Sequence, residues 1–177
     1  MSLISTGSYA PKFSLENEHL TKLVDTSTEW IEKRTGIKRR NISAGENTSD
    51  LAYEAAKQAI ENSGVALEDI DLVLVATITP DHFTPSTASI VQGKLGIKNA
   101  VAFDLSAGCT GFVYALGVAS SMIKNGIANN ALVIGSEVLS KVIDYADRNT
   151  CVIFGDGAGA LLLTKELNNK IKDVYLQ

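Results

Sequence analysis

The chain has 177 residues, of which 45% are hydrophobic and 20% charged, with a formal net charge of −4. This length and apolar content are enough for one domain with a sizeable core, and they exclude disordered and fibrous classes. The acidic balance argues against the broad positive field that nonspecific nucleic-acid binding requires, so we expect no nucleic-acid partner.

The first ten residues lack the basic and apolar regions of a signal peptide. No apolar run approaches the roughly 20 residues that span a bilayer. We therefore expect a cytoplasmic protein without membrane contact.

The N-terminal part of the chain predicts one strand and two helices. Residues 4–9 favour a short strand, and residues 17–32 favour a single helix that reaches Trp30. The next helix is expected to begin near Thr48, within a run of N-cap residues, and to end at Gly64.

The middle of the chain alternates apolar runs with helical patterns. Residues 72–78, 100–103 and 131–134 are apolar almost throughout, which is typical of strands covered on both faces. A helix is expected over 86–96. Another is expected over about 109–125, apolar nearly all round and therefore buried in the middle of the molecule. This alternation predicts an α/β fold with a mostly parallel central sheet layered between helices.

Residues 151–164 favour two strand segments around a glycine turn. Within them, Gly155–Ala160 formally matches the G-x-G-x-x-A dinucleotide pattern. That fingerprint requires a following helix, whereas residues 161–163 favour a strand. A tight turn that lets backbones pack closely is the preferred interpretation, and a nicotinamide-dependent oxidoreductase is the alternative.

Cys109 lies where the apolar strand of residues 100–104 passes through small residues into an apolar helix. The positive end of a helix dipole and free backbone N–H groups both favour a thiolate at such a position. Gly108 and Gly111 leave room for a substrate or a neighbouring backbone. A reactive cysteine and a buried structural cysteine are both open from the residues alone.

The second cysteine, Cys151, also lies in an apolar segment, so a disulfide framework is not expected. The two histidines, His19 and His82, have no metal-ligand spacing with the cysteines, and no metal site is predicted. We expect His19 to be exposed. His82 lies in a loop after a strand, so its pairing with Cys109 as a catalytic dyad stays open.

A cluster of basic residues lies next to Trp30: Lys33, Arg34, Lys38, Arg39 and Arg40. One interpretation is a solvated basic loop. The other is a site for an adenine nucleotide or coenzyme A, because an indole beside guanidinium groups can stack a purine and hold phosphates.

Four segments together resemble β-ketoacyl-[acyl carrier protein] synthase III, the condensing enzyme that starts bacterial-type fatty acid synthesis: residues 4–11, 25–37, 103–116 and 147–160. They span almost the whole chain in the family's order. The resemblance implies the thiolase fold, which has two similar α/β halves. Residues 1–177 then form one N-terminal thiolase-like domain, and the second, C-terminal half is absent from this chain.

The resemblance also implies roles for individual residues. Cys109 would take the acyl group from acyl-coenzyme A as a thioester, which then condenses with malonyl-acyl carrier protein and releases CO2. Trp30 and Arg148 would sandwich the adenine of coenzyme A, with Thr26 and Arg34 as neighbouring contacts. Acyl-coenzyme A is a substrate, so no permanently bound cofactor is expected.

The family's enolate-stabilising histidine and asparagine come from its second half, so this chain alone is not expected to complete the reaction. Family members are homodimers joined through the strand that matches residues 100–104. The residue that matches Thr84 lines the neighbouring subunit's acyl pocket and is often a bulky aromatic in relatives that accept short primers. With a threonine there, the length and branching of the primer are left open.

Two further alternatives remain. A noncatalytic coenzyme A or nucleotide-binding module would use Trp30, Arg34 and Arg148 with Cys109 merely buried. A related ketosynthase of polyketide or other secondary metabolism would share all the motifs.

Overall fold

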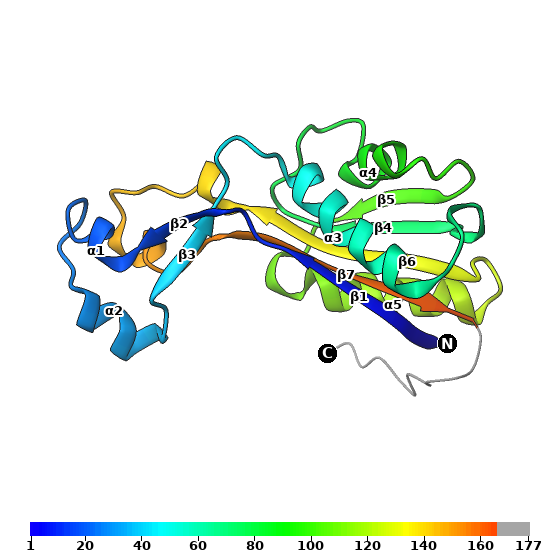
Figure 1. Cartoon of the computed structure of the whole chain (residues 1–177), viewed down its shortest axis with the longest axis horizontal. Helices are drawn as coiled ribbons and strands as arrows, with labels where there is room; N and C mark the ends of the chain where they lie inside the picture. Colours follow the sequence, from blue (N-terminus) through cyan, green and yellow to red (C-terminus); the bar gives the residue numbers. More distant parts are fainter. Residues whose placement is uncertain (166–177) are drawn as a thin grey trace.

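The computed structural model describes residues 1–165, which form a layered α/β body and a smaller module beside it (Figure 1). The strands are β1 (Ser2–Tyr9), β2 (Phe13–Glu16), β3 (Arg39–Ile42), β4 (Leu72–Ala76), β5 (Val101–Leu105), β6 (Asn130–Val138) and β7 (Asp156–Thr164). The helices are α1 (Asn17–Leu20), α2 (Thr28–Thr35), α3 (Thr48–Ser63), α4 (Thr87–Leu95), α5 (Gly111–Lys124) and α6 (Arg148–Cys151).

The main sheet has the strand order β1-β7-β6-β4-β5. Strand β4 pairs in parallel with both β5 and β6, so Leu74 lies between Phe103 and Val133. Strand β7 runs antiparallel to both β6 and β1. The predicted α/β class is confirmed, but the sheet is mixed rather than mostly parallel, because its β7 and β1 side is antiparallel.

Helices cover both faces of this sheet. Ala55 and Ala59 of α3 belong to one buried cluster with Val73 and Val75 of β4, and Ala115 of α5 belongs to the cluster on the opposite face. All five residues of β4 are buried as a result. This two-sided cover explains why residues 72–78 are apolar without alternation.

Strand β1 lies directly against α3. A Cβ atom on Gly7 would overlap the backbone oxygen of Ala55 and would lie 2.6 Å from the backbone nitrogen of Ala59. The hydroxyl of Ser5 donates a hydrogen bond of 2.6 Å to the Ala59 carbonyl oxygen. Glycine at position 7 therefore sets the distance between this strand and the helix.

Helix α5 was predicted to be buried on all sides, but only the side that faces the sheet is buried. Ala115, Ala119 and Ile123 pack on the sheet and are buried, whereas Val113 is 44% exposed. An apolar pattern all round a helix indicates that every side is suited to burial. It does not indicate which element covers each side. Among the described residues of this chain, α5 is covered by the sheet alone.

The smaller module contains the two-stranded antiparallel sheet of β2 and β3 together with α1, α2 and α6, and lies at the left of Figure 1. It has a core of its own, which includes Leu20, Ile31, Cys151 and Val152. The single helix predicted over 17–32 is wrong, because α1 ends at Leu20 and α2 begins at Thr28. The Ser27 hydroxyl accepts the Trp30 N–H at 3.1 Å, and this cap starts a new helix where the apolar pattern continues.

The prediction for residues 151–164 also needs correction. Cys151 ends helix α6, and the glycines from Gly157 onward lie inside the single strand β7 rather than in a turn. The Asp147 carboxylate accepts the Asn149 N–H at 2.9 Å and so caps α6. The close backbone approach is real at Gly155, where an added Cβ would lie 3.0 Å from the Asn41 carbonyl oxygen.

No helix within residues 1–165 is both long enough and apolar enough to cross a membrane.

Candidate active site

Cys109 sits in a 3-10 turn, Gly108–Thr110, that leads directly into α5. Gly108 has φ = +55°, a left-handed conformation that glycine adopts easily. The Thr110 hydroxyl closes the turn by donating to the Ala107 carbonyl oxygen at 3.0 Å. Cys109 is exposed, so the interpretation as a buried structural thiol does not describe this residue.

Cys109 lines a pocket of about 630 Å³ with mainly apolar walls. The pocket lies where β4 and β6 end and β7 begins, which is the side of an α/β sheet where ligands commonly bind. Phe112 of α5 fills the space over Gly135 of β6, where an added Cβ would be 3.1 Å from the ring. Other lining residues include Ala76, Ile78, Glu137, Leu139, Thr150, Phe154 and Ala158.

The structure brings Trp30, Arg34 and Arg148 together. The guanidinium carbon of each arginine is 4.9 Å from the centre of the Trp30 ring, within cation–π range. Arg148 also donates to the Asp25 carbonyl oxygen at 2.9 Å. We call Trp30, Arg34 and Arg148 the indole cluster.

Thr26, the fourth residue expected to contact the cofactor, lies in the turn just before α2. Its hydroxyl oxygen is buried and has no hydrogen-bond partner among the described residues. A buried polar atom without a partner is uncommon in proteins, and it leaves a donor and an acceptor free for a ligand.

Helix α6 connects the indole cluster with the Cys109 pocket. Its first residue, Arg148, stacks on Trp30, and two residues later Thr150 lines the pocket. The Thr150 hydroxyl is held by the Asp147 carboxylate at 2.9 Å. A ligand bound on the indole and reaching to the thiol would therefore pass along one short helix.

The predicted basic cluster divides into two kinds of residue. Lys33, Arg34, Lys38 and Arg39 are exposed, as either interpretation requires. Arg40 is only 4% exposed, because its side chain enters the core of the small module. Its inclusion in a solvent-facing basic patch is therefore wrong.

The remaining candidates lie apart from the Cys109 pocket. His19 is exposed, as expected. His82 is exposed in the loop after β4, where it lines a separate pocket with Phe83, so the structure does not support a Cys109–His82 dyad. Cys151 is buried, and burial raises the pKa of its thiol. Within residues 1–165, no cluster of histidine, cysteine and acidic side chains is arranged to hold a metal ion.

The dinucleotide pattern at Gly155–Ala160 lacks its required context. Its last five residues belong to β7, which runs from Asp156 to Thr164 with no helix after the glycines. Without a helix N-terminus there is no phosphate site of the kind that this fingerprint builds.

Sequence reasoning missed Glu137, which lines the pocket at the end of β6. Its carboxylate accepts hydrogen bonds from the Ile78 N–H at 2.8 Å and from the Thr79 hydroxyl at 2.5 Å. Both donors belong to the loop after β4. An acidic residue three positions after the apolar run 131–134 was the available signal, since functional groups gather where parallel strands end.

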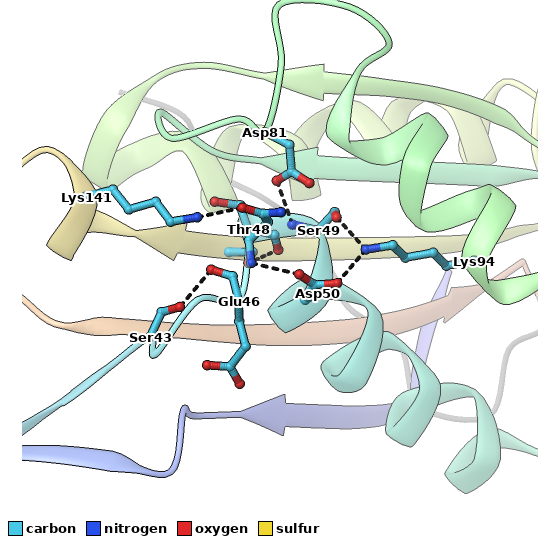
Figure 2. Close-up of polar contacts among 10 residues, drawn as sticks. Ser43, Glu46, Thr48, Ser49, Asp50, Asp81, Lys94 and Lys141 are labelled. Carbon is cyan, nitrogen blue, oxygen red and sulfur yellow. Dashed lines mark hydrogen bonds and ion pairs between the residues drawn. The ribbon is translucent and has the colours of Figure 1, made fainter.

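The same loop is also attached to the N-terminus of α3. The Asp81 carboxylate accepts the Ser49 N–H at 2.9 Å, and Lys94 of α4 bonds both Ser49 and Asp50, at 2.7 and 2.6 Å (Figure 2). The loop that flanks the pocket is therefore fixed from two sides, by Glu137 and by α3.

Comparison with known proteins gives consistent matches. The family model of 3-oxoacyl-[acyl-carrier-protein] synthase III matches residues 103–177. A β-ketoacyl-[acyl-carrier-protein] synthase III of Clostridium perfringens (strain SM101 / Type A) is 59% identical over 162 residues, which make up 92% of this chain and 50% of that protein. The chain spans about half the length of the curated relatives it matches.

Solved structures agree with this result. The crystal structure of 3-oxoacyl-[acyl-carrier-protein] synthase III from Aquifex aeolicus VF5 superposes with a TM-score of 0.92 at 50% identity, covering 94% of this chain and 54% of that one. The priming β-ketosynthase of the R1128 polyketide pathway gives 0.88 at 39% identity, covering 91% and 48%. Together with the four motif segments, these matches show that the chain is homologous to about half of a β-ketoacyl-[acyl-carrier-protein] synthase III.

Proposed function

We propose that Cys109 is the nucleophile of a decarboxylating condensation that initiates fatty acid synthesis. The observation that carries the proposal is the exposed thiol at the start of α5, in the wall of a largely apolar pocket. Such a pocket suits an acyl chain, and a thiol at a helix N-terminus suits nucleophilic attack.

In the first step, the Cys109 sulfur attacks the thioester carbonyl of acyl-coenzyme A, and the coenzyme A thiol leaves with a proton. In the second step, malonyl-acyl carrier protein loses CO2, and the resulting carbanion equivalent attacks the acyl-Cys109 thioester. The Cys109 thiolate leaves, and the product is a 3-oxoacyl-acyl carrier protein.

The indole cluster supports coenzyme A as the acyl donor. An adenine could enter between Trp30 and Arg148 and stack on both once the Arg148 side chain moves away from the ring, with Arg34 and the unpartnered Thr26 hydroxyl beside it. The position of Thr150 on the same helix as Arg148 would direct the rest of the donor toward Cys109.

The second step needs donors that stabilise the developing enolate. We assign these to the half of the family fold that lies outside this chain, so residues 1–177 act as its N-terminal domain. We further propose a cytoplasmic homodimer joined along β5. Val101 of this edge strand is 52% exposed, and an exposed apolar edge favours pairing with a second copy.

The test uses the complete gene product incubated with acetyl-coenzyme A, followed by intact-mass measurement. The wild type and Cys151→Ala are expected to gain the mass of one acetyl group, and Cys109→Ala is expected to gain none. Acetylation of Cys109→Ala at the wild-type level would rule out the proposed nucleophile.

The match to the R1128 priming ketosynthase supports a second candidate, a priming condensation in polyketide synthesis. The two functions differ in the carrier protein that accepts the product. Condensation rates with malonyl groups on fatty-acid and polyketide carrier proteins, measured in parallel, would distinguish them.

A further inference from the structure

Arg40 is a buried charge whose hydrogen-bond acceptors are all neutral. The side chain is 4% exposed, and its guanidinium donates to the Leu15 carbonyl oxygen at 3.1 Å, the Asn17 side-chain oxygen at 2.7 Å and the Val152 carbonyl oxygen at 3.0 Å. Its Nε has no hydrogen-bond partner among the described residues. Burial lowers the pKa of Arg40. Burying a charged guanidinium among neutral acceptors costs free energy of folding. We therefore look for the role of Arg40 in the geometry that its hydrogen bonds impose.

The three acceptors come from three different segments. Leu15 belongs to β2, Asn17 begins α1, and Val152 directly follows α6. Asn17 carries the connection further, because its side-chain amide donates to the Ile37 carbonyl oxygen at 2.7 Å. Ile37 lies just after Gly36, the residue that ends α2. Arg40 therefore links the end of α6 to the end of α2.

These two helices carry the indole cluster. Trp30 and Arg34 lie on α2, and Arg148 lies on α6. Ile31, the neighbour of Trp30, packs in the same buried cluster as Val152. A change in the separation of α2 and α6 would therefore change the stacking of Arg148 on the indole, where its guanidinium carbon is now 4.9 Å from the ring centre.

We propose that Arg40 is a positioning residue that sets the spacing between Trp30 and Arg148, and thereby the fit of the adenine group. The inference rests on the proposed use of coenzyme A, and it adds a residue that never touches the ligand. Only arginine suits this role, because its planar fork presents several N–H donors in fixed directions. A lysine offers a point charge that cannot reach all three acceptors in the same way.

The experiment compares Arg40→Lys, Arg40→Met and Asn17→Ala with Lys22→Met in the complete gene product. Lys22 is exposed in the same module, so its replacement removes one positive charge without disturbing the core. Two acyl donors are used: acetyl-coenzyme A, and acetyl-pantetheine, which has the same thioester but no adenine nucleotide. Circular dichroism verifies the fold of each variant.

Both Arg40 variants are expected to raise the KM for acetyl-coenzyme A by about tenfold with little change in kcat. The reason is that the bound substrate and the transition state lose the same contacts to the adenine. Acylation by acetyl-pantetheine is expected to stay at the level of Lys22→Met. Asn17→Ala removes one of the three acceptors, so it should raise the same KM by a smaller factor, and it tests the proposal if the Arg40 variants do not fold.

A second measurement does not depend on activity. In protein labelled with 5-fluorotryptophan, the ¹⁹F resonance that disappears in Trp30→Phe reports on the indole. This resonance is expected to shift in the ligand-free Arg40 variants and in Asn17→Ala, but not in Lys22→Met. An unshifted resonance, or equal losses with both acyl donors, would overturn the proposal.

The two hypotheses can be distinguished. If coenzyme A does not move the Trp30 resonance of the wild type, the adenine site of the proposed function is wrong. The ligand-free spectra of the variants still decide whether Arg40 holds Trp30 and Arg148 in place.

Discussion

The Glu137 carboxylate accepts the Ile78 backbone N–H at 2.8 Å and thereby joins the end of β6 to the loop that follows β4. Both residues line the Cys109 pocket. The contact means that Glu137 is one of the two attachments that fix this pocket wall, the other being the contact of the loop with α3. Because the Thr77 and Thr79 hydroxyls donate to the same carboxylate, at 3.2 and 2.5 Å, replacement of Glu137 affects three donors at once.

Replacing Glu137 with alanine is expected to lower the free energy of unfolding by about 1–3 kcal/mol, because partly buried donors lose their acceptor. Amide hydrogen exchange at Ile78 should become faster, since its N–H loses its partner. Glu61→Ala, at an exposed position of α3, is the control and should change neither quantity. Unchanged exchange at Ile78 would contradict this account of the loop.

Trp30→Ala and Arg148→Ala each remove one side of the indole cluster. Each is expected to raise the KM for acetyl-coenzyme A by about tenfold, corresponding to about 1.4 kcal/mol, while kcat stays near the wild-type value. The double variant should show less than the sum of the two effects, because the residues are in contact. Steady-state kinetics with acetyl-coenzyme A and acetyl-pantetheine check this result, and equal losses with both donors would count against an adenine site.

Two glycine substitutions should act in opposite directions. Gly7→Ala forces a Cβ into the α3 backbone at Ala55 and Ala59, and we expect a loss of about 3 kcal/mol in the free energy of unfolding. Gly93→Ala, within α4, has no atom within 4 Å of the added Cβ and should gain up to about 1 kcal/mol from helix propensity. Chemical denaturation measures both. A Gly7→Ala protein of wild-type stability would mean that β1 and α3 are farther apart than described.

The ion pair between Lys94 and Asp50 predicts a dependence of stability on pH. Burial acts to raise the pKa of Asp50, but the hydrogen bond from Lys94, the backbone hydrogen bond from Asn47 and the positive charges of Lys94 and Lys141 together outweigh it, so the pKa lies below its ordinary value. A carboxylate with a lowered pKa stabilises the folded state above its unfolded pKa of about 3.9 and loses that contribution as the pH falls through the folded value.

Lys94→Met should therefore cost at most about 1 kcal/mol at pH 7, since both side chains are about a third or more exposed. The part of the cost that comes from the ion pair should disappear as the pH falls through the lowered pKa of Asp50, because the protonated carboxyl no longer attracts Lys94. The exposed Lys98→Met is the matched control. A cost from Lys94→Met that does not change with pH would show that its bond to Ser49, and not the ion pair, is responsible.

The two cysteines should differ in their reaction with iodoacetamide. Cys109 is exposed, whereas Cys151 is fully buried and its pKa is raised by that burial, so only Cys109 should be alkylated in the folded protein. Acetyl-coenzyme A should protect Cys109. Peptide mass spectrometry before and after unfolding measures both sites. Alkylation of Cys109 that coenzyme A thioesters do not slow would favour a noncatalytic binding module.

Much of the layered body could be predicted from the sequence, because its elements carry strong local signals. The run at 72–78, apolar almost throughout, predicted a strand covered on both faces, and β4, which spans residues 72–76, is buried throughout. Gly64 and Gly96 predicted where α3 and α4 end, and both residues adopt positive φ. The antiparallel placement of β7 was not predictable in this way, since strand pairing is a relationship between distant segments.

The small module was harder to predict because its elements are short. The residues from 17 to 32 continue a helical pattern, yet α1 ends at Leu20 and α2 begins only after the Ser27 cap. Arg39 and Arg40 are identical residues side by side, yet one is exposed and the other is buried. Successive residues of a strand face opposite sides, so the covered side depends on what packs against it.

The sequence by itself determined which side chains could carry the chemistry: a cysteine between small residues at the start of an apolar helix, and an indole beside guanidinium groups. Only the tertiary structure decided that Cys109 is exposed in a pocket, that Arg148 stacks directly on the Trp30 ring, and that Arg40 bonds Val152 at the end of α6 and Asn17 of α1. The reason is physical. Residue type and local spacing fix what a group can do, whereas its burial and its partners depend on contacts between segments that are distant in the chain.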